Sequence, residues 1–344
     1  MRADVTTDPT RDGTPVPLLQ VDDLAIEFAT PDGVVRAVDG LSYSVSAGRT
    51  LAIVGESGSG KSVSSLAVMG LLQQPPARIV RGSIRFGGTE LLSLGQKAHR
   101  AVCGENIAMV FQDALAALNP VHTVGWQLTE ALRARHGMSR RDATARAVEL
   151  LDLVKVPNAK QRVKEYPHQF SGGMRQRVMI AMALSMDPEV LIADEPTTAL
   201  DVTVQAQIMR LLSEIQAERQ MGLILITHDM GVVANVADDV TVMYAGRAVE
   251  QASVFDIYAA PAHPYTRALL GSIPRLDQKG GGLAVIPGRP PDPTQVPAGC
   301  AFHPRCAFAE DVCRADPPPP TVSLPFDRTS ACHFAEEVMN HDEH

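Results

Sequence analysis

Short apolar runs alternate with stretches of helical periodicity along the first 255 residues or so. Three runs predict buried strands, at Thr50–Val54, Val190–Ala193 and Leu223–Ile226, and a fourth strand is expected at Asp239–Tyr244. A helix from about Lys61 to Leu72 follows the first strand. Strands that alternate with helices are typical of a mostly parallel sheet, so the predicted fold class is α/β.

Helical patterns dominate between about residues 91 and 187. Apolar side chains recur at helical spacing from Ala143 to Val154, and Gly172 to Met186 is a run of good helix formers. We therefore predict a helical subdomain at about 91–187, inserted into an α/β core that spans residues 19–260.

The two ends of the chain differ from this core in composition. Residues 1–18 begin with a polar stretch rich in Thr, Asp, Arg and Pro, and they predict a disordered tail. Beyond about residue 260, proline and glycine are dense, as at Gly280–Gly282 and Pro317–Pro320, and regular periodicity is lost. We predict that residues 261–344 form an irregular extension that needs a staple, because it can bury little core of its own.

Composition and charge exclude several classes of protein. Of the 344 residues 45% are hydrophobic but only 4% are aromatic, and the formal net charge is -8, so no nucleic-acid partner is expected. No apolar run approaches about 18 residues, the length that a membrane-spanning helix needs. The N-terminus also lacks the apolar region of a signal peptide. We therefore expect a soluble intracellular protein whose membrane role, if any, is carried by partner chains.

The segment from Gly55 to Ser62 reads Gly-Glu-Ser-Gly-Ser-Gly-Lys-Ser and fits the pattern G-x-x-x-x-G-K-[ST] between a strand and a helix. Its glycines allow successive backbone N–H groups to face phosphates, and the N-terminus of the following helix faces the same anion. Lys61 would neutralise the β- and γ-phosphates, and the Ser62 hydroxyl would ligate Mg²⁺. The motif predicts a nucleotide site.

A second acidic motif ends the strand expected at 190–193. Asp194 is expected to make another Mg²⁺ contact, and Glu195 can orient and polarise the attacking water. A third motif, Phe170-Ser-Gly-Gly-Met-Arg-Gln-Arg177, precedes a long predicted helix. Ser171 is a good N-cap and the two glycines expose N–H groups, so a second anion-binding helix end is predicted, although the segment taken alone could equally be an ordinary cap.

The third motif resembles the signature of the ABC ATPase family, usually LSGGQ, and the rest of the family's motifs follow in order. Phe111–Gln112 resembles the Q-loop, Thr198–Asp201 the D-loop, His228 the switch histidine, and Phe28 the aromatic residue that stacks on adenine. The resemblance implies a RecA-like P-loop NTPase cassette at residues 19–260, with the helical insert as its subdomain.

The family also implies how these residues act. Two cassettes pair head to tail, and each ATP lies between the P-loop of one chain and the signature helix of the other. Glu195 would be the catalytic base, His228 would hold the γ-phosphate, and Gln112 would sense Mg²⁺ and water, with Lys61 completing the catalytic set. The resemblance assigns the ATP contacts to Phe28, Gly55, Ser57, Gly58, Ser59, Gly60, Lys61, Ser62, Ser171, Gly172, Gly173 and Asp201, and the Mg²⁺ contacts to Ser62, Gln112 and Asp194.

Three further segments resemble the ATPases of oligopeptide and dipeptide importers: Ala117–Pro120, Ala262–Leu270 and Pro297–Cys306. The resemblance implies an ATP-hydrolysing translocase subunit that drives peptide import as a peripheral protein on the cytoplasmic face of the cell membrane. Its partners would be a second ATPase subunit, commonly a distinct one so that a heterodimer is favoured, two transmembrane permease subunits and an extracytoplasmic substrate-binding protein. The cargo stays open among dipeptides, longer peptides, nickel chelates and other small solutes.

Two other function classes are weighed against this one. A non-transport ABC ATPase of translation or DNA repair usually carries two cassettes in one chain or a long coiled-coil insert, and this sequence shows neither. A purely regulatory nucleotide-binding module is disfavoured by the intact Glu195 and His228.

Four of the five cysteines crowd into the extension, at Cys300, Cys306, Cys313 and Cys332, whereas Cys103 stands alone. Four thiolates suit zinc or an iron–sulfur cluster, and the absence of paired C-x2-C units makes zinc the weaker choice. Some members of the resembled subfamily hold a 4Fe–4S cluster at matching cysteines. We therefore expect a structural 4Fe–4S cluster, with zinc and free or disulfide-bonded thiols as alternatives. Because the core of the cassette is expected to lie before residue 260, ATP binding should be independent of this site.

Overall fold

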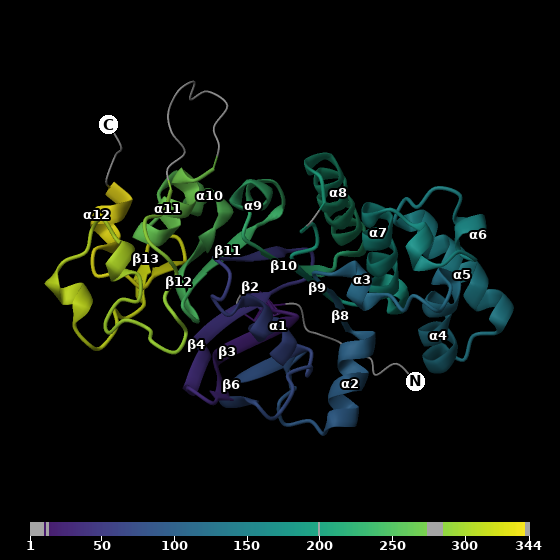
Figure 1. The fold of residues 1–344 in the computed structure, drawn as a ribbon, viewed down its shortest axis with the longest axis horizontal. Coiled ribbons are helices and arrows are strands. Elements are labelled where there is room, and N and C mark those ends of the chain that lie inside the picture. The colour runs from purple at the N-terminus through teal and green to yellow at the C-terminus, as the bar shows by residue number, and fades with distance from the viewer. Residues whose placement is uncertain (1–9, 12–13, 199, 274–284, 341–344) are drawn as a thin grey trace. The chain divides into compact units, whose positions relative to one another are not determined.

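The chain divides into two compact units in the computed structural model, which describes residues 10–11, 14–198, 200–273 and 285–340 (Figure 1). The first unit comprises Met1–Val45, Thr50–Ser93 and Ile226–His344, and the second comprises Ser46–Arg49 and Leu94–Leu225.

Some sequence predictions fall outside the described residues. These are most of the disordered tail expected at 1–18, the glycine run Gly280–Gly282, and Ala199 of the D-loop. Within the described ranges, no helix combines the length and the apolar character that crossing a bilayer requires.

Two sheets form the body of the first unit. One has the strand order β4-β3-β6-β7, and in the other β13-β14-β12-β11-β5 follow one another. Among these strands β5 and β11 pair in parallel, and the other neighbouring pairs are antiparallel. The strands of this unit are β1 (Thr10–Arg11), β2 (Thr14–Pro15), β3 (Leu19–Thr30), β4 (Gly33–Val45), β5 (Thr50–Val54), β6 (Ala77–Phe86), β7 (Thr89–Glu90), β11 (Asp239–Tyr244), β12 (Arg247–Ser253), β13 (Val322–Leu324) and β14 (Arg328–Ser330).

The predicted strands at 50–54 and 239–244 are confirmed with the same bounds as β5 and β11. The helix expected after the first of them is also present, but it ends at Val68 instead of Leu72 because Gly70 adopts a left-handed φ of 63°. The helices and 3-10 turns of the first unit are α1 (Lys61–Val68), α9 (Met230–Val236), α10 (Val254–Ala259), α11 (Pro264–Gly271), η3 (His303–Arg305), η4 (Asp311–Arg314) and α12 (Ala335–Asn340).

The second unit contains three neighbouring strands in the order β10-β9-β8 and most of the long helices. The strands predicted at 190–193 and 223–226 are confirmed as β9 (Val190–Asp194) and β10 (Gly222–Thr227). The other elements of this unit are α2 (Gln96–Glu105), β8 (Ile107–Val110), α3 (Ala114–Ala117), α4 (Val124–His136), α5 (Arg140–Leu153), α6 (Ala159–Arg162), η1 (Pro167–Gln169), α7 (Gly172–Ala183), η2 (Leu184–Met186) and α8 (Val202–Arg219).

The region expected to be mainly helical, at about 91–187, contains a strand that the sequence analysis missed. β8 pairs in parallel with β9, and Ile107 and Val110 are fully buried. A four-residue apolar run carries too little periodicity to distinguish a buried strand from a helix.

The C-terminal extension is more regular than its composition predicts. It contributes α11, α12, β13 and β14 to the first unit, and β14 pairs with β12 of the cassette sheet. Tyr265 and Phe302 are buried in the same apolar cluster as Val54, Val242 and Tyr244. The expectation that the core lies before residue 260 is therefore wrong, because large aromatic side chains beyond that point complete it.

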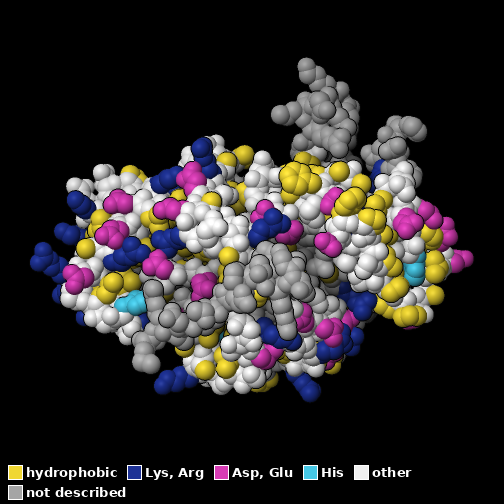
Figure 2. Space-filling view, turned by 180° about the vertical axis from the view of Figure 1, so that it is seen from behind, with side chains coloured by type: hydrophobic (Ala, Val, Ile, Leu, Met, Phe, Trp, Pro, Cys, Tyr) yellow, Lys and Arg dark blue, Asp and Glu magenta, His cyan; other side chains and the backbone are white. Residues whose placement is uncertain are grey.

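Charged side chains of both signs are interspersed over the face shown in Figure 2. Among the described residues on that face, lysine and arginine do not gather into a continuous basic area. This distribution agrees with the formal net charge of -8.

Candidate functional site

The phosphate loop of the first unit follows β5 directly and leads into α1. Gly60 stands at the N-cap of α1 with a φ of 98°, and a Cβ at this position would lie 2.3 Å from the carbonyl oxygen of Ala37. Only glycine fits both the backbone angle and the close approach of β4. The loop is thus shaped by the residue types that the motif specifies.

Lys61 lies at the start of α1 with only 5% of its surface exposed. Its Nζ donates hydrogen bonds to the carbonyl oxygens of Gly55 at 2.8 Å and Glu56 at 2.9 Å. The ammonium group therefore folds back over the loop, in the position from which it can neutralise a bound phosphate.

A cavity of about 200 Å³ opens beside this loop within the first unit. The loop side is formed by Ser57, Gly58, Ser59 and Gly60, and β4 contributes Val35, Arg36 and Ala37. The extension adds Pro290, Pro291, Pro293 and Val296 to the same wall. Phe28 is half-buried on β3 and is absent from this lining, whereas its cross-strand neighbour Val35 is present. The adenine-stacking role of Phe28 stays a prediction.

His228 follows β10 and is exposed. The next residue, Asp229, caps α9 by accepting a hydrogen bond from the backbone N–H of Val232, and its own N–H donates to the Thr227 hydroxyl at 3.0 Å. The strand end and the helix cap fix the backbone on both sides of the histidine.

The acidic pair of the second unit stands at the end of β9. Asp194 is buried, and Glu195 adopts a left-handed φ of 45°. The Gln112 amide and the Thr198 hydroxyl donate hydrogen bonds to the same Glu195 oxygen, Oε2, at 2.9 Å and 2.8 Å. The structure therefore brings together the predicted Q-loop glutamine and the predicted base.

The signature segment begins α7 as predicted. Ser171 caps the helix by accepting from the backbone N–H of Met174 at 3.4 Å, and Gly172 and Gly173 form its first residues. A Cβ on Gly173 would lie 2.6 Å from Cγ1 of Val204 in α8, so a side chain here would collide with the neighbouring helix. Asp201 caps α8 in turn, accepting from the Val204 N–H at 2.9 Å.

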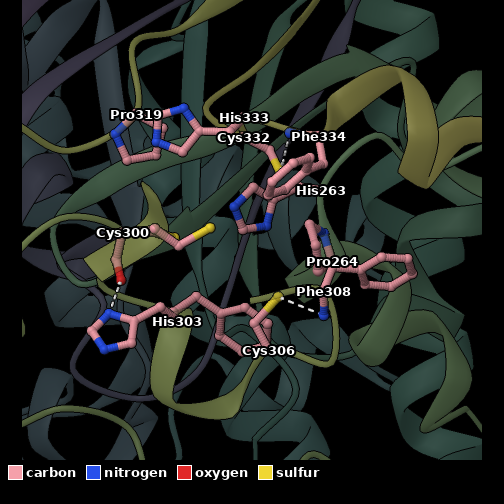
Figure 3. A pocket seen from close by; sticks show the side chains of 12 residues that line it. His263, Pro264, Cys300, His303, Cys306, Phe308, Pro319, Cys332, His333 and Phe334 are labelled. Carbon is pink, nitrogen blue, oxygen red and sulfur yellow. Dashed lines mark hydrogen bonds between the residues drawn. The ribbon is translucent and has the colours of Figure 1, made fainter. Parts of the chain in front are cut away.

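The four cysteines of the extension line one pocket, together with His263, His303 and His333. Figure 3 shows the sulfur atoms of Cys300, Cys306 and Cys332 on three sides of a common space. Cys313, which is buried, completes the set. Cysteines up to 32 positions apart in the chain therefore line one pocket, and the staple expected from the sequence stays a prediction.

The thiols of this pocket are free and largely shielded from water. All five cysteines lie within the described residues, and none is paired in a disulfide. Burial raises the pKa of Cys306 to about 11 and that of Cys332 to about 12. Backbone N–H groups of Phe308 and Phe334 donate to the sulfurs of Cys306 and Cys332, at 3.3 Å and 3.4 Å. Donors of this kind stabilise thiolates when a cation is bound.

The described side chains around the pocket are not arranged as the ligands of a metal ion. In the part of the chain that the structure describes, no group of three or more His, Cys, Asp or Glu side chains is arranged to hold one metal ion. Nδ1 of His303 lies 2.9 Å from the carbonyl oxygen of Cys300, so this ring nitrogen is already engaged by the backbone.

Comparison with known families agrees with both parts of the chain. The family described as ABC transporter matches residues 38–198, and the family described as oligopeptide/dipeptide transporter, C-terminal region, matches residues 249–313. The oligopeptide transport ATP-binding protein OppD of Salmonella typhimurium is 52% identical over 301 residues, which are 88% of this chain and 89% of that protein. This chain belongs to the ABC transporter family, among the ATP-binding proteins of oligopeptide/dipeptide transporters.

Other relatives of this ABC ATPase extend the comparison. The dipeptide transport ATP-binding protein DppD of Escherichia coli is 48% identical over 317 residues, covering 92% of this chain and 96% of that protein. Among solved structures, cbiO1 from Clostridium perfringens, part of an ABC transporter complex, has a TM-score of 0.61 and 28% identity and covers 71% of this chain and 91% of that one. A dimeric bacterial ABC transporter cassette gives 0.62 and 25%, over 69% of this chain and 98% of that one.

The sequence analysis missed residues of this ABC ATPase that contact the phosphate loop from the extension. The backbone N–H of Glu56 donates to the hydroxyl of Tyr265 at 2.9 Å, and the Glu56 carboxylate pairs with Arg305. Tyr265 and Arg305 lie 209 and 249 residues further along the chain, and no motif spacing connects them with the loop.

Proposed function

We propose that this chain hydrolyses ATP to energise the import of peptides through a multi-subunit ABC transporter. The similarity to OppD and DppD, over about nine tenths of the chain and including the matched C-terminal region, carries the proposal. The phosphate loop and the oriented carboxylate of Glu195 support hydrolysis rather than binding alone.

We assign a different role in phosphoryl transfer to each residue of the site. Lys61 and the backbone N–H groups of the loop neutralise the phosphates, and Glu195 accepts a proton from the water that attacks the γ-phosphate. Gln112 holds the Glu195 carboxylate in place, and His228 contacts the γ-phosphate. Ser62, Gln112 and Asp194 would hold Mg²⁺, whose charge favours the transition state when it is bound.

A second cassette completes each site. Ser171, Gly172 and Gly173 at the N-terminus of α7 bind the nucleotide held by the partner, because an exposed helix N-terminus attracts phosphate. The dimeric form of a similar cassette supports this arrangement. We propose a heterodimer with a related ATPase, bound to two transmembrane permease subunits at the cytoplasmic face of the membrane and supplied by a substrate-binding protein. The domain limits 19–260 and 261–344 are part of the same proposal.

A 4Fe–4S cluster is the group that the cysteine pocket suits best. Four thiols line it, no disulfide joins them, and their spacing lacks the paired C-x2-C units that are common in zinc sites. Cys300, Cys306, Cys313 and Cys332 would hold the cluster, whose bound cationic iron would offset the cost of burying thiolates. Its role would be structural, because ATP hydrolysis contains no redox step.

Reconstitution tests the proposed transport. The chain, its permease partners and their binding protein would be placed in proteoliposomes, and uptake of a labelled tripeptide, dipeptide and nickel–histidine chelate would be measured with and without ATP. We expect ATP-dependent peptide uptake that Glu195→Gln abolishes. If only the nickel chelate were taken up, the proposed peptide cargo would be wrong and the chelate would be the cargo. ATPase activity that does not depend on the permease subunits would favour a non-transport role.

A further inference from the structure

Arg305 of the extension forms a forked ion pair with Glu56 of the phosphate loop. Nη1 donates to Oε2 at 2.6 Å and Nη2 to Oε1 at 2.9 Å, so both carboxylate oxygens are engaged. The Arg305 side chain is only 5% exposed and that of Glu56 is 25% exposed. A two-point pair shielded from water in this way is stronger and more specific in direction than a surface contact.

The surroundings of Arg305 fix its position. Nε donates to the carbonyl oxygen of Pro287 at 2.8 Å, and the guanidinium lies 5.9 Å from the ring centres of both Tyr244 and Phe302. Nη1 is also 3.3 Å from the Tyr244 hydroxyl. The guanidinium is therefore held in place by contacts other than Glu56.

Glu56 is held at three points, and each belongs to the nucleotide site or to the extension. Its N–H donates to Tyr265, its carbonyl oxygen accepts from Lys61, and its carboxylate pairs with Arg305. The Gly55–Glu56 peptide group is contacted from both sides, because its carbonyl oxygen accepts from Lys61 at 2.8 Å and its N–H donates to Tyr265 of the extension. The phosphate-loop motif leaves this position open to any residue type, so the motif itself does not explain an acid here.

A carboxylate in the wall of a phosphate site is unfavourable by itself. Glu56 lines the cavity beside the loop, together with Ser57 to Gly60. An unpaired negative charge there would repel a triphosphate, since like charges a few ångströms apart interact strongly where water is partly excluded.

We infer that Arg305 is a positioning residue of the ATP site, which neutralises the Glu56 carboxylate and fixes the loop residue whose carbonyl oxygen accepts from Lys61. The affinity of the phosphate loop for ATP therefore depends on the C-terminal extension of the same chain. The inference rests on the loop as the ATP site but not on the cargo or on the transporter's partners.

The test measures the affinity of the full-length chain for the non-hydrolysable analogue AMP-PNP with Mg²⁺, by calorimetry, at about 50 mM and about 300 mM salt. Arg305→Met should weaken binding about tenfold at low salt, and less at high salt, because the unpaired Glu56 charge is then screened. Adding Glu56→Gln to Arg305→Met should restore the affinity to within about twofold. Arg314→Met, which removes an exposed arginine of the same extension, should bind like wild type.

Two results would overturn the inference. One is unchanged affinity in Arg305→Met, and the other is failure of Glu56→Gln to rescue that variant, which would make Arg305 a purely structural residue. If Arg305→Met does not fold, Arg305→Lys keeps the charge without the fork and should bind about threefold more weakly. If a folded Arg305→Lys variant bound AMP-PNP with wild-type affinity at both salt concentrations, the positioning role of Arg305 would also be rejected. Transport is not part of the readout, so a failure here is distinct from a failure of the proposed import.

Discussion

Gln112 and Glu195 are joined by a hydrogen bond of 2.9 Å from the amide Nε2 to the carboxylate Oε2. The Thr198 hydroxyl donates to the same oxygen at 2.8 Å. Two donors on one oxygen orient the carboxylate, so a change at Gln112 would reach the residue that we propose as the catalytic base directly. Both residues lie within the second unit.

Glu195→Gln should abolish most ATP turnover while leaving ATP binding intact. The amide keeps the shape and the hydrogen-bonding oxygen but cannot accept a proton, so kcat should fall by a factor of roughly 10² to 10⁴. The measurement is phosphate release by the assembled transporter, with nucleotide binding titrated in parallel. Glu189→Gln is the matched control, because this exposed glutamate directly precedes β9 and its carboxylate accepts a hydrogen bond from Asn106. Wild-type turnover in the Glu195 variant would exclude it as the base.

Neighbouring signature glycines should respond differently to alanine. In Gly173→Ala the new Cβ would lie 2.6 Å from Val204, which forces α7 and α8 apart, whereas in Gly172→Ala it meets Leu200 at an ordinary 3.4 Å. Overpacking of this kind costs about 1–3 kcal/mol. We expect Gly173→Ala to lower the unfolding temperature and Gly172→Ala to leave it nearly unchanged. Equal thermal stability of the two variants would contradict the packing argument.

The isolated chain should hydrolyse ATP slowly, because the proposed site needs the signature helix of a second cassette. Mixing it with the cognate partner ATPase and permease subunits should raise the turnover per chain. A rate that is already maximal and independent of chain concentration in the purified protein would count against this shared site.

Anaerobically purified protein should be brown, with broad absorbance near about 400 nm and about four iron atoms per chain. Cys306→Ser should lower the iron content, whereas Cys103→Ser should not, because Cys103 lies in α2 and is not among the residues that line the cysteine pocket. One zinc ion and no iron per chain would contradict the 4Fe–4S assignment but would still agree with a metal that staples the extension. Finding neither metal would contradict both hypotheses.

Loss of the cluster should also weaken ATP binding. Arg305 ends η3, which lies between Cys300 and Cys306, so a looser cysteine segment would release Glu56. This expectation replaces the independence that the sequence suggested. The measurement is the AMP-PNP affinity of Cys306→Ser. If that variant lost its iron but kept its affinity, ATP binding would be independent of the cluster.

The sequence predicted those parts of the site whose functional residues are neighbours in the chain. The phosphate loop, the acidic pair and the signature are contiguous motifs, and the strand and helix bounds around them follow from buried runs and caps such as Ser171. β8 escaped because four apolar residues fit either period. The contacts of Arg305 and Tyr265 with Glu56 could not be predicted from the sequence. They join residues more than 200 positions apart, and no local pattern connects such residues.

The pairing of β14 with β12 has a consequence for any shortened form of this protein. Glu250 and Gln251 on β12 face Ser330 and Thr329 on β14, and Ser330 is fully buried. A chain that stopped at residue 260 would keep every nucleotide motif, yet it would leave β12 as an edge strand, paired with β11 on one side only. It would also uncover the apolar surface on which Tyr265 and Phe302 pack. Exposed strand margins beside apolar surface recruit other chains, so the minimal cassette would self-associate before it could be assayed.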